Sequence, residues 1–109
     1  MSFRLRVRKG RKGTGIPILE IRGDFAGENA SKASVMLEEM RTFSKANIAV
    51  DLQHTTFIDS VGLGVFVYCW RLLENDKRDM LFIKPQGFVL KMFESTSLDR
   101  VFKVVETIE

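Results

Sequence analysis

The sequence predicts an α/β fold, with a mixed sheet of four or five strands and covering helices. Basic and apolar residues alternate over residues 3–8, which is the period of a strand with one buried face. Apolar residues recur at helical spacing over residues 29–44, and unbroken apolar runs at 48–52 and 80–83 are typical of central strands. This order predicts an antiparallel hairpin followed by right-handed parallel crossovers. A chain of 109 residues suffices for one core, so residues 1–109 are expected to form one domain.

The first expected strand and the loop after it carry much of the chain's positive charge. Six of the 17 Lys and Arg residues lie before residue 13, and the net charge of the whole chain is +3. We interpret Arg4, Arg6 and Arg8 as the solvated face of an edge strand, where such charges also oppose aggregation between sheets. Residues 9–15 hold three glycines and are expected to form a hairpin loop before the apolar strand at residues 16–21.

The remaining segments alternate between helices and strands. The apolar side of the first expected helix consists of Ala33, Met36, Leu37, Met40 and Phe43. A loop at residues 53–58 leads to a more apolar helix from Ser60 to Leu73, which ends at a polar cluster at residues 74–79. The strand at 80–83 is the last main strand, and residues 87–93 and 98–105 are ambiguous between helical and mixed structure.

Composition excludes several classes of protein. No apolar run approaches the roughly 20 residues that span a bilayer, so we expect a cytoplasmic protein without membrane insertion. The basic residues lack the aromatic interleaving, zinc spacing or helix-turn-helix pattern that direct nucleic-acid binding would predict. We expect no metal site and no cofactor, because the chain lacks a Cys/His cluster, a P-loop and a dinucleotide fingerprint. Cys69 lies within the apolar second helix and is interpreted as a buried structural thiol.

Ser60 is the strongest indication of function. It follows Asp59, a good N-cap residue, and falls in the first turn of the second helix. The unpaired N–H groups and the dipole at a helix start favour an anion, so a phosphate on Ser60 fits this position. Gly62 and Gly64 are expected to leave the backbone uncovered where another molecule approaches. The plainer interpretation is that the Asp-Ser pair only caps the helix.

Three motifs together resemble a known family. The central one, Asp59-Ser60-Val61-Gly62-Leu63-Gly64, follows a strand that ends in Asp51-Leu52. Gly23-Asp24 follows the second expected strand, and Ser97-Leu98-Asp99 lies near the C-terminus. These motifs resemble the STAS domain, the family of bacterial anti-sigma factor antagonists, whose pattern reads Asp-Ser-(Ser/Thr)-Gly-Leu-Gly. Val61 replaces the usual second hydroxyl residue, and Ser97 stands where glycine is common.

The resemblance implies a partner-switching regulator. The unmodified protein is expected to bind an anti-sigma factor with serine kinase activity, and phosphorylation of Ser60 is expected to release it. A PP2C-type phosphatase would reset the cycle. The resemblance further implies that partner binding or acceptor orientation involves Asp24, Asp59, Val61, Gly62 and Leu63. The added charge beside Asp24 and Asp59 would oppose a complex whose surface must desolvate.

Two alternatives come from other classes of protein. The first is a phosphorylation-independent STAS scaffold, or a soluble subunit of a stressosome or a lipid-transport complex. The second is a hydrolase, because Asp51, His54 and Ser60 are the ingredients of a catalytic triad. Ser60 lacks the glycine two positions earlier that a nucleophile elbow requires, so we interpret the chain as non-catalytic.

Overall fold

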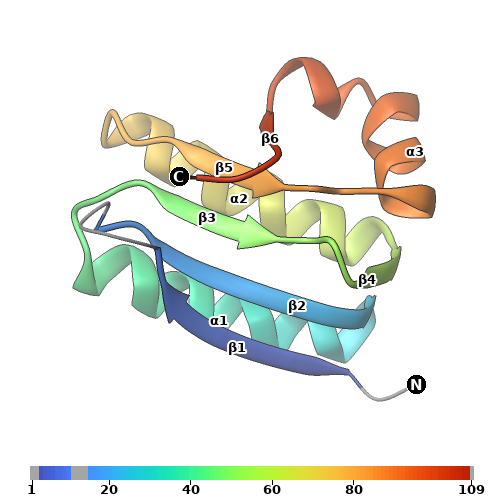
Figure 1. Cartoon of the computed structure of the whole chain (residues 1–109), viewed down its shortest axis with the longest axis horizontal. Coiled ribbons are helices and arrows are strands. Elements are labelled where there is room, and N and C mark those ends of the chain that lie inside the picture. The colour runs from blue at the N-terminus through green and yellow to red at the C-terminus, as the bar shows by residue number, and fades with distance from the viewer. Residues whose placement is uncertain (1–2, 11–14, 109) are drawn as a thin grey trace.

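A mixed sheet, with two long helices behind it, organises the chain (Figure 1). The computed structural model describes residues 3–10 and 15–108, so residues 11–14 of the expected hairpin loop lie outside the described part. Within it the elements are β1 (Arg4–Lys9), β2 (Pro17–Phe25), α1 (Gly27–Phe43), β3 (Ile48–Asp51), β4 (Thr55–Ile58), α2 (Ser60–Asn75), β5 (Met80–Ile83), α3 (Gly87–Ser95), the 3-10 turn η1 (Leu98–Arg100) and β6 (Lys103–Val105).

The described strands form one sheet in the order β1-β2-β3-β5-β6, with β4 paired to the end of β2. The β1–β2 pair is antiparallel, and β2, β3, β5 and β6 run parallel to one another. This arrangement confirms the mixed sheet, the hairpin and the parallel crossovers that the sequence predicts. The described residues form six strands, more than the four or five expected.

Two boundaries differ from the expectation. The predicted loop at residues 53–58 contains β4, which pairs in parallel with residues 23–25 of β2. The second strand therefore continues past Ile21 to Phe25, and its register shifts between Gly23 and Asp24. Gly23 has a φ of 90°, a conformation that glycine adopts without steric cost, and this bend turns the end of β2 toward β4.

The structure defines the two C-terminal segments whose secondary structure was ambiguous from the sequence. Residues 87–95 are helical, and residues 98–105 divide into the η1 turn and the short strand β6. Ser97 joins α3 to η1 with a φ of 62°, in the left-handed region that favours glycine. This conformation is a physical reason for the glycine that is common at the corresponding position of the motif.

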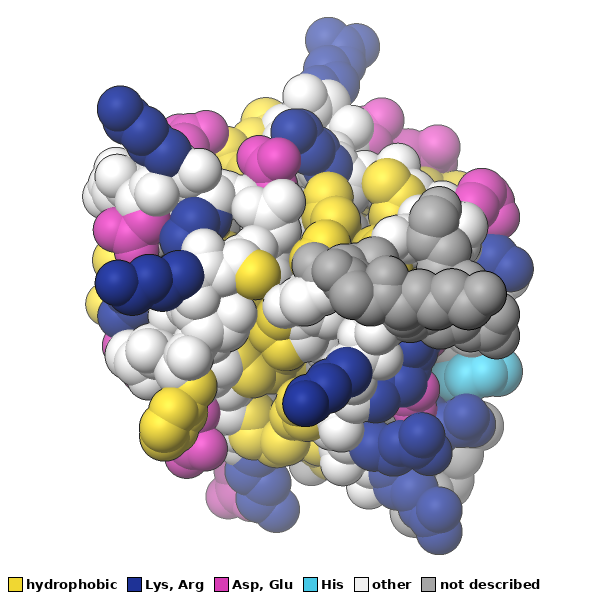
Figure 2. Space-filling model, turned by 60° about the vertical axis from the view of Figure 1, so that its left-hand side comes forward, with side chains coloured by type: hydrophobic (Ala, Val, Ile, Leu, Met, Phe, Trp, Pro, Cys, Tyr) yellow, Lys and Arg dark blue, Asp and Glu magenta, His cyan; other side chains and the backbone are white. Residues whose placement is uncertain are grey.

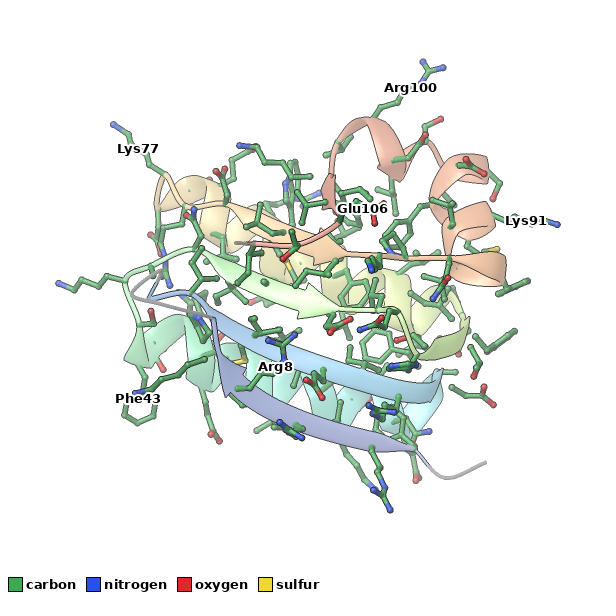
Figure 3. The ribbon with its side chains drawn as sticks, viewed as in Figure 1. Arg8, Phe43, Lys77, Lys91, Arg100 and Glu106 are labelled. Carbon is green, nitrogen blue, oxygen red and sulfur yellow. The ribbon has the colours of Figure 1, made fainter. Side chains whose placement is uncertain are left out.

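The core lies between the sheet and the helices and is rich in phenylalanine. Phe66 of α2 stacks on Phe25 at a ring-centroid distance of 4.6 Å and meets the edge of Phe82 at 5.1 Å. Cys69 is buried as expected, and this burial raises the pKa of its thiol to about 11. The expectation for Phe43 was wrong: its ring is 90% exposed at the last residue of α1 and projects away from the fold (Figure 3).

The opposite face of the sheet carries the outward arginines of β1. Arg6 is mostly exposed, as a solvated strand face predicts. Arg8 corrects that interpretation, because it donates to Glu20 and, at 3.1 Å, to the carboxylate of Asp51 on β3. Asp51 is only 5% exposed, so Arg8 supplies the counter-charge for a buried carboxylate. Val7, expected to face inward, is 45% exposed at the sheet edge.

Among the described residues, no helix is both long enough and apolar enough to cross a bilayer.

Candidate functional site

Ser60 is the first residue of α2, and its side chain is exposed. It follows β4 after a single residue, Asp59, whose carboxylate accepts a hydrogen bond from the N–H of Gly62 at 2.9 Å. The carbonyl oxygen of Asp59 accepts the N–H of Leu63 at 2.9 Å. Asp59 is thus the N-cap that the sequence predicts, and it occupies one of the unpaired donors of the helix start.

The second carboxylate oxygen of Asp59 reaches a different helix. It accepts the N–H of Gly27, the first residue of α1, at 3.1 Å. The N-cap residue of α1 is Ala26, which has no side-chain acceptor to offer. One carboxylate therefore serves the N-terminal ends of both long helices. The sequence carries no sign of this contact, since Gly27 and Asp59 are 32 residues apart.

Asp24 lies near the end of β2, within the strand and not in a turn after it. Its carboxylate accepts the hydroxyl of Thr56 at 3.0 Å, and its carbonyl accepts the side-chain amide of Asn29 at 3.0 Å. The neighbouring residue Phe25 pairs with Ile58, which immediately precedes Asp59. Asp24 and Asp59 therefore lie at the same end of the sheet, as the parallel arrangement predicts.

The four residues after Ser60 have different environments. Val61 is 45% exposed, whereas Leu63 is partly buried and packs against the core. Gly62 is buried, which corrects the expectation of an uncovered backbone: a Cβ atom there would lie 2.5 Å from the carbonyl oxygen of Phe25. Gly64 is exposed, and a Cβ atom would meet nothing within 4 Å. The exposed part of the motif is thus Ser60, Val61 and Gly64.

Of the three triad ingredients, Asp51 is paired with residues outside the triad. The carboxylate of Asp51 accepts from Arg8 and from the N–H of Gln53, both at 3.1 Å. Over residues 3–10 and 15–108, His54 makes no hydrogen bond through its imidazole with Asp51 or Ser60. In the same ranges no group of three or more His, Cys, Asp or Glu side chains is placed to hold a metal ion.

Thr56 is the residue of this site that the sequence did not single out. Its hydroxyl orients Asp24, and it belongs to β4, which was expected to be a loop. The site therefore combines the end of β2, the whole of β4 and the first turns of α1 and α2. It presents a serine hydroxyl, two carboxylates and exposed apolar surface, which are features of a docking and modification site.

Comparisons with known proteins place the chain in one family. The STAS domain model of that family matches residues 9–109. The curated anti-sigma-B factor antagonist of Listeria monocytogenes is 24% identical over 84 residues, covering 77% of this chain and 74% of that protein.

Solved structures share the fold. A candidate anti-sigma factor antagonist from Thermotoga maritima has a TM-score of 0.84 at 22% identity, covering 95% of this chain and 87% of that one. The Bacillus cell fate determinant SpoIIAA in its phosphorylated form has a TM-score of 0.68 at 16% identity, covering 95% and 91%.

Proposed function

Because the chain belongs to the STAS domain family, we propose that it is an anti-sigma factor antagonist controlled by phosphorylation of Ser60. In the unmodified state it binds an anti-sigma factor that is also a serine kinase, and a PP2C-type phosphatase removes the phosphate. The protein itself acts by binding and not by catalysis. The observation that carries this proposal is the exposed hydroxyl of Ser60 at the start of α2, next to Asp59 and at the end of the sheet that holds Asp24. A relative named as an anti-sigma-B factor antagonist supports it.

We propose that the charge added by phosphorylation switches partner binding off. A phosphate on Ser60 adds about −1.5 to −2 charges next to Asp59 and at the end of the sheet that holds Asp24. The N–H of Gly62 is already taken by Asp59, so the phosphate cannot use that donor without displacing the cap. The modified surface therefore gains anionic charge that a desolvated interface must leave unpaired. We propose that this cost releases the partner.

The neighbouring residues have separate roles in this proposal. Asp24 and Asp59 orient the segment that carries the acceptor, since they fix β4 and the first turn of α2. Val61 offers an apolar contact to the partner. Gly62 and Leu63 hold the first turn against the core and thereby set the position of Ser60.

Substitution of Ser60 tests the switch. We expect Ser60→Ala to bind the anti-sigma factor as the wild type does and to stay bound when ATP is added. We expect Ser60→Asp to weaken binding by about 1–3 kcal/mol, the scale of an unpaired charge at a desolvated surface. Isothermal titration calorimetry measures the affinities, and peptide mapping after incubation with the kinase and ATP locates the phosphate.

Ser95→Asp is the matched control, because Ser95 is also exposed and the same charge is added at the last residue of α3. It should leave the affinity unchanged. Equal affinities for wild type, Ser60→Ala and Ser60→Asp would contradict the switch. That result would favour a phosphorylation-independent scaffold or a subunit of a stressosome or lipid-transport complex.

A further inference from the structure

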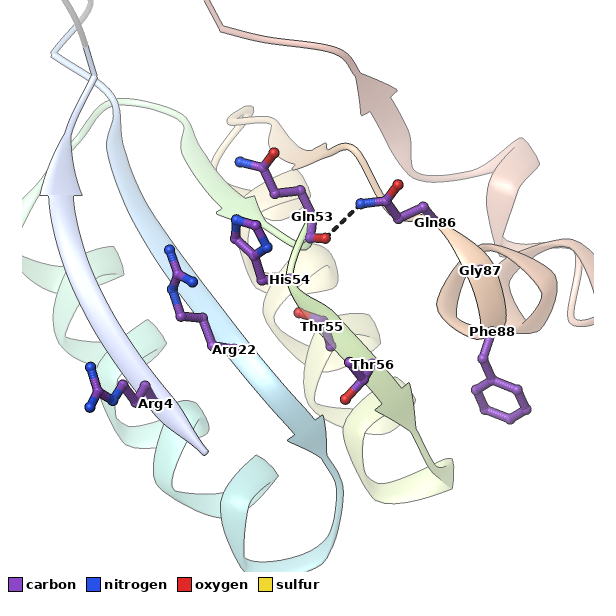
Figure 4. Close-up of a pocket in the computed structure, with 9 residues that line it drawn as sticks. All are labelled: Arg4, Arg22, Gln53, His54, Thr55, Thr56, Gln86, Gly87 and Phe88. Carbon is purple, nitrogen blue, oxygen red and sulfur yellow. Dashed lines mark hydrogen bonds between the residues drawn. The ribbon is translucent and has the colours of Figure 1, made fainter. Parts of the chain in front are cut away.

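The strand β1 forms an open edge of the sheet, since over the described residues it pairs with β2 alone. An edge strand can accept a further strand, because its outward N–H and C=O groups have no partner. We propose that β1 binds an extended segment of another protein in which acidic and apolar residues alternate. Figure 4 shows β2 between β1 and β4, the strand that leads to Ser60, so this edge is separate from the phosphorylation site.

The strand register identifies the backbone groups of β1 that face outward. Gly10 donates to the carbonyl of Ile16 at 2.9 Å, so these two residues form a hydrogen-bonded pair. Such pairs alternate with non-hydrogen-bonded ones along an antiparallel ladder, and the β1–β2 register is unbroken from residue 4 to residue 9. The even-numbered residues of β1 therefore bond to β2. The N–H and C=O groups of Leu5, Val7 and Lys9 point away from it.

The same edge borders an apolar groove between the sheet and α1, with a volume of about 300 Å³. Apolar side chains form most of its lining, among them Val7 of β1 and Met36, Met40 and Phe43 of α1. Alternate side chains of an added strand would project into this groove, and apolar ones would bury its exposed surface. Glu39 is the one charged residue of the lining, so it disfavours acidic side chains on this side.

The other face of β1 is cationic and defines the second half of the partner's pattern. Arg4 is the register partner of Arg22, and within the described ranges neither has a carboxylate partner. Arg6 is mostly exposed and reaches Glu20 only at 4.0 Å. Acidic residues of an added strand would lie directly opposite Arg4 and Arg6, in close non-hydrogen-bonded pairs. Figure 2 shows hydrophobic side chains beside a group of Lys and Arg side chains in the lower part of the molecule.

A second copy of the chain does not fit this edge. If two β1 strands paired antiparallel, with the helices of both copies on one side of the sheet, even-numbered residues would lie opposite even-numbered ones. Registers that overlap most of β1 then set arginine against arginine, because Arg4, Arg6 and Arg8 share one face. Like charges in that position oppose pairing. The arginines therefore act against self-association and favour an acidic strand.

A synthetic peptide tests the proposal with the full-length chain. The capped peptide alternates Glu and Val over six residues, the length of β1, and calorimetry should show that it binds at millimolar concentration. A peptide with Lys in place of Glu should not bind, since it meets the arginines with like charge. N-methylation of the valines should abolish binding, and N-methylation of the glutamates should leave it unchanged. Only the valine N–H groups face β1 when the valines lie on the groove side.

Variants of the chain test the two faces of β1 separately. The double variant Arg4→Gln, Arg6→Gln should bind the peptide about tenfold more weakly, since two cross-strand ion pairs are lost. The double variant Lys91→Gln, Arg100→Gln is the matched control. It removes the same charge from exposed positions on α3 and η1 that project away from the fold (Figure 3), and it should bind as the wild type does. Phe43→Ala should weaken binding about threefold, because it reduces the apolar wall of the groove.

Amide hydrogen exchange provides a readout of the backbone contact itself. In the free protein the N–H groups of Leu5 and Val7 should exchange faster than those of Arg6 and Arg8, and saturating peptide should slow the exchange of Leu5 and Val7. Ser60→Asp should bind the peptide as the wild type does, so a failure of this proposal leaves the phosphorylation switch intact.

Three results would overturn the proposal. The first is the absence of peptide binding at millimolar concentration. The second is equal binding of the valine-methylated and glutamate-methylated peptides. The third is an equal loss of affinity in the arginine double variant and its control. Dimerisation of the chain through β1, detected by sedimentation, would also contradict it.

Discussion

Gly62 fixes the distance between α2 and the end of β2. A Cβ atom at this position would lie 2.5 Å from the carbonyl oxygen of Phe25 and 2.8 Å from side-chain atoms of Phe25 and Ile58. Backbone and buried side chains would have to move to admit it. We expect Gly62→Ala to lower the free energy of unfolding by about 1–3 kcal/mol, the cost of overpacking. The denaturant midpoint, at unchanged slope, measures this loss.

Gly64 is the control for that measurement. It lies two residues further along the same helix, where a Cβ atom meets nothing within 4 Å. Gly64→Ala should therefore stabilise the protein by about 0.5–1 kcal/mol, because alanine loses less backbone entropy in a helix. If both substitutions shift the midpoint in the same direction, the close packing at Gly62 does not determine the outcome. In the sequence the two glycines are equivalent members of one motif. Only the fold shows that one is tightly packed and the other is not.

At the scale of elements, Arg8 ties the edge strand β1 to the central strands. It spans from β1 to Glu20 on β2 and Asp51 on β3, and Asp51 is almost fully buried. We expect Arg8→Gln to cost about 1.5–3 kcal/mol of unfolding free energy, because Asp51 loses its charged donor. Arg6→Gln should change stability by less than about 0.5 kcal/mol, as its contact with Glu20 is long and exposed. Urea denaturation compares the two, and equal losses would contradict this assignment.

Elements with a strong periodic pattern could be predicted, and β4 could not. The residues of β3 are buried on both faces, so an unbroken apolar run in the sequence predicts this strand. Thr56 and Phe57 of β4 are exposed, and this short strand exists because the bend at Gly23 brings β2 alongside. Residues 103–105 are likewise too few and too exposed to carry a pattern. Their pairing depends on β5, a long-range contact that local sequence does not encode.

At the scale of the whole molecule, one phenylalanine cluster joins the sheet, α2 and α3. Phe66 contacts the rings of Phe25, Phe82 and Phe93, so it packs against three other elements. We expect Phe66→Ala to lower the free energy of unfolding by about 3–5 kcal/mol. Phe43→Ala removes the same ring from a position that is 90% exposed and should change it by less than about 0.5 kcal/mol. Calorimetric melting compares the stabilities of the two variants. A large loss of unfolding free energy in Phe43→Ala would contradict the exposed position of this ring.

The candidate site was predictable only where its geometry is local. Asp59 caps the helix that begins at the next residue, through the N–H of Gly62 three residues away, so the sequence places both the cap and Ser60 correctly. The hydrogen bonds of Asp24 with Thr56 and of Asp59 with Gly27 each join residues 32 apart. No rule of local sequence spacing predicts these long-range hydrogen bonds, because they depend on how β2, β4 and both helices pack together.

The double contact of Asp59 has a dynamic consequence. Its two carboxylate oxygens hold the N–H of Gly27 and the N–H of Gly62, so a rotation of this one side chain releases one N–H at the start of α1 and one at the start of α2 together. Loss of these two hydrogen bonds is therefore one coupled event, while the backbone bonds from Ala30 to Ala26 and from Leu63 to Asp59 hold each first turn separately. The segment around Ser60 thereby shares its fluctuations with the beginning of α1, although nearly the whole of α1, β3 and β4 separates them along the chain.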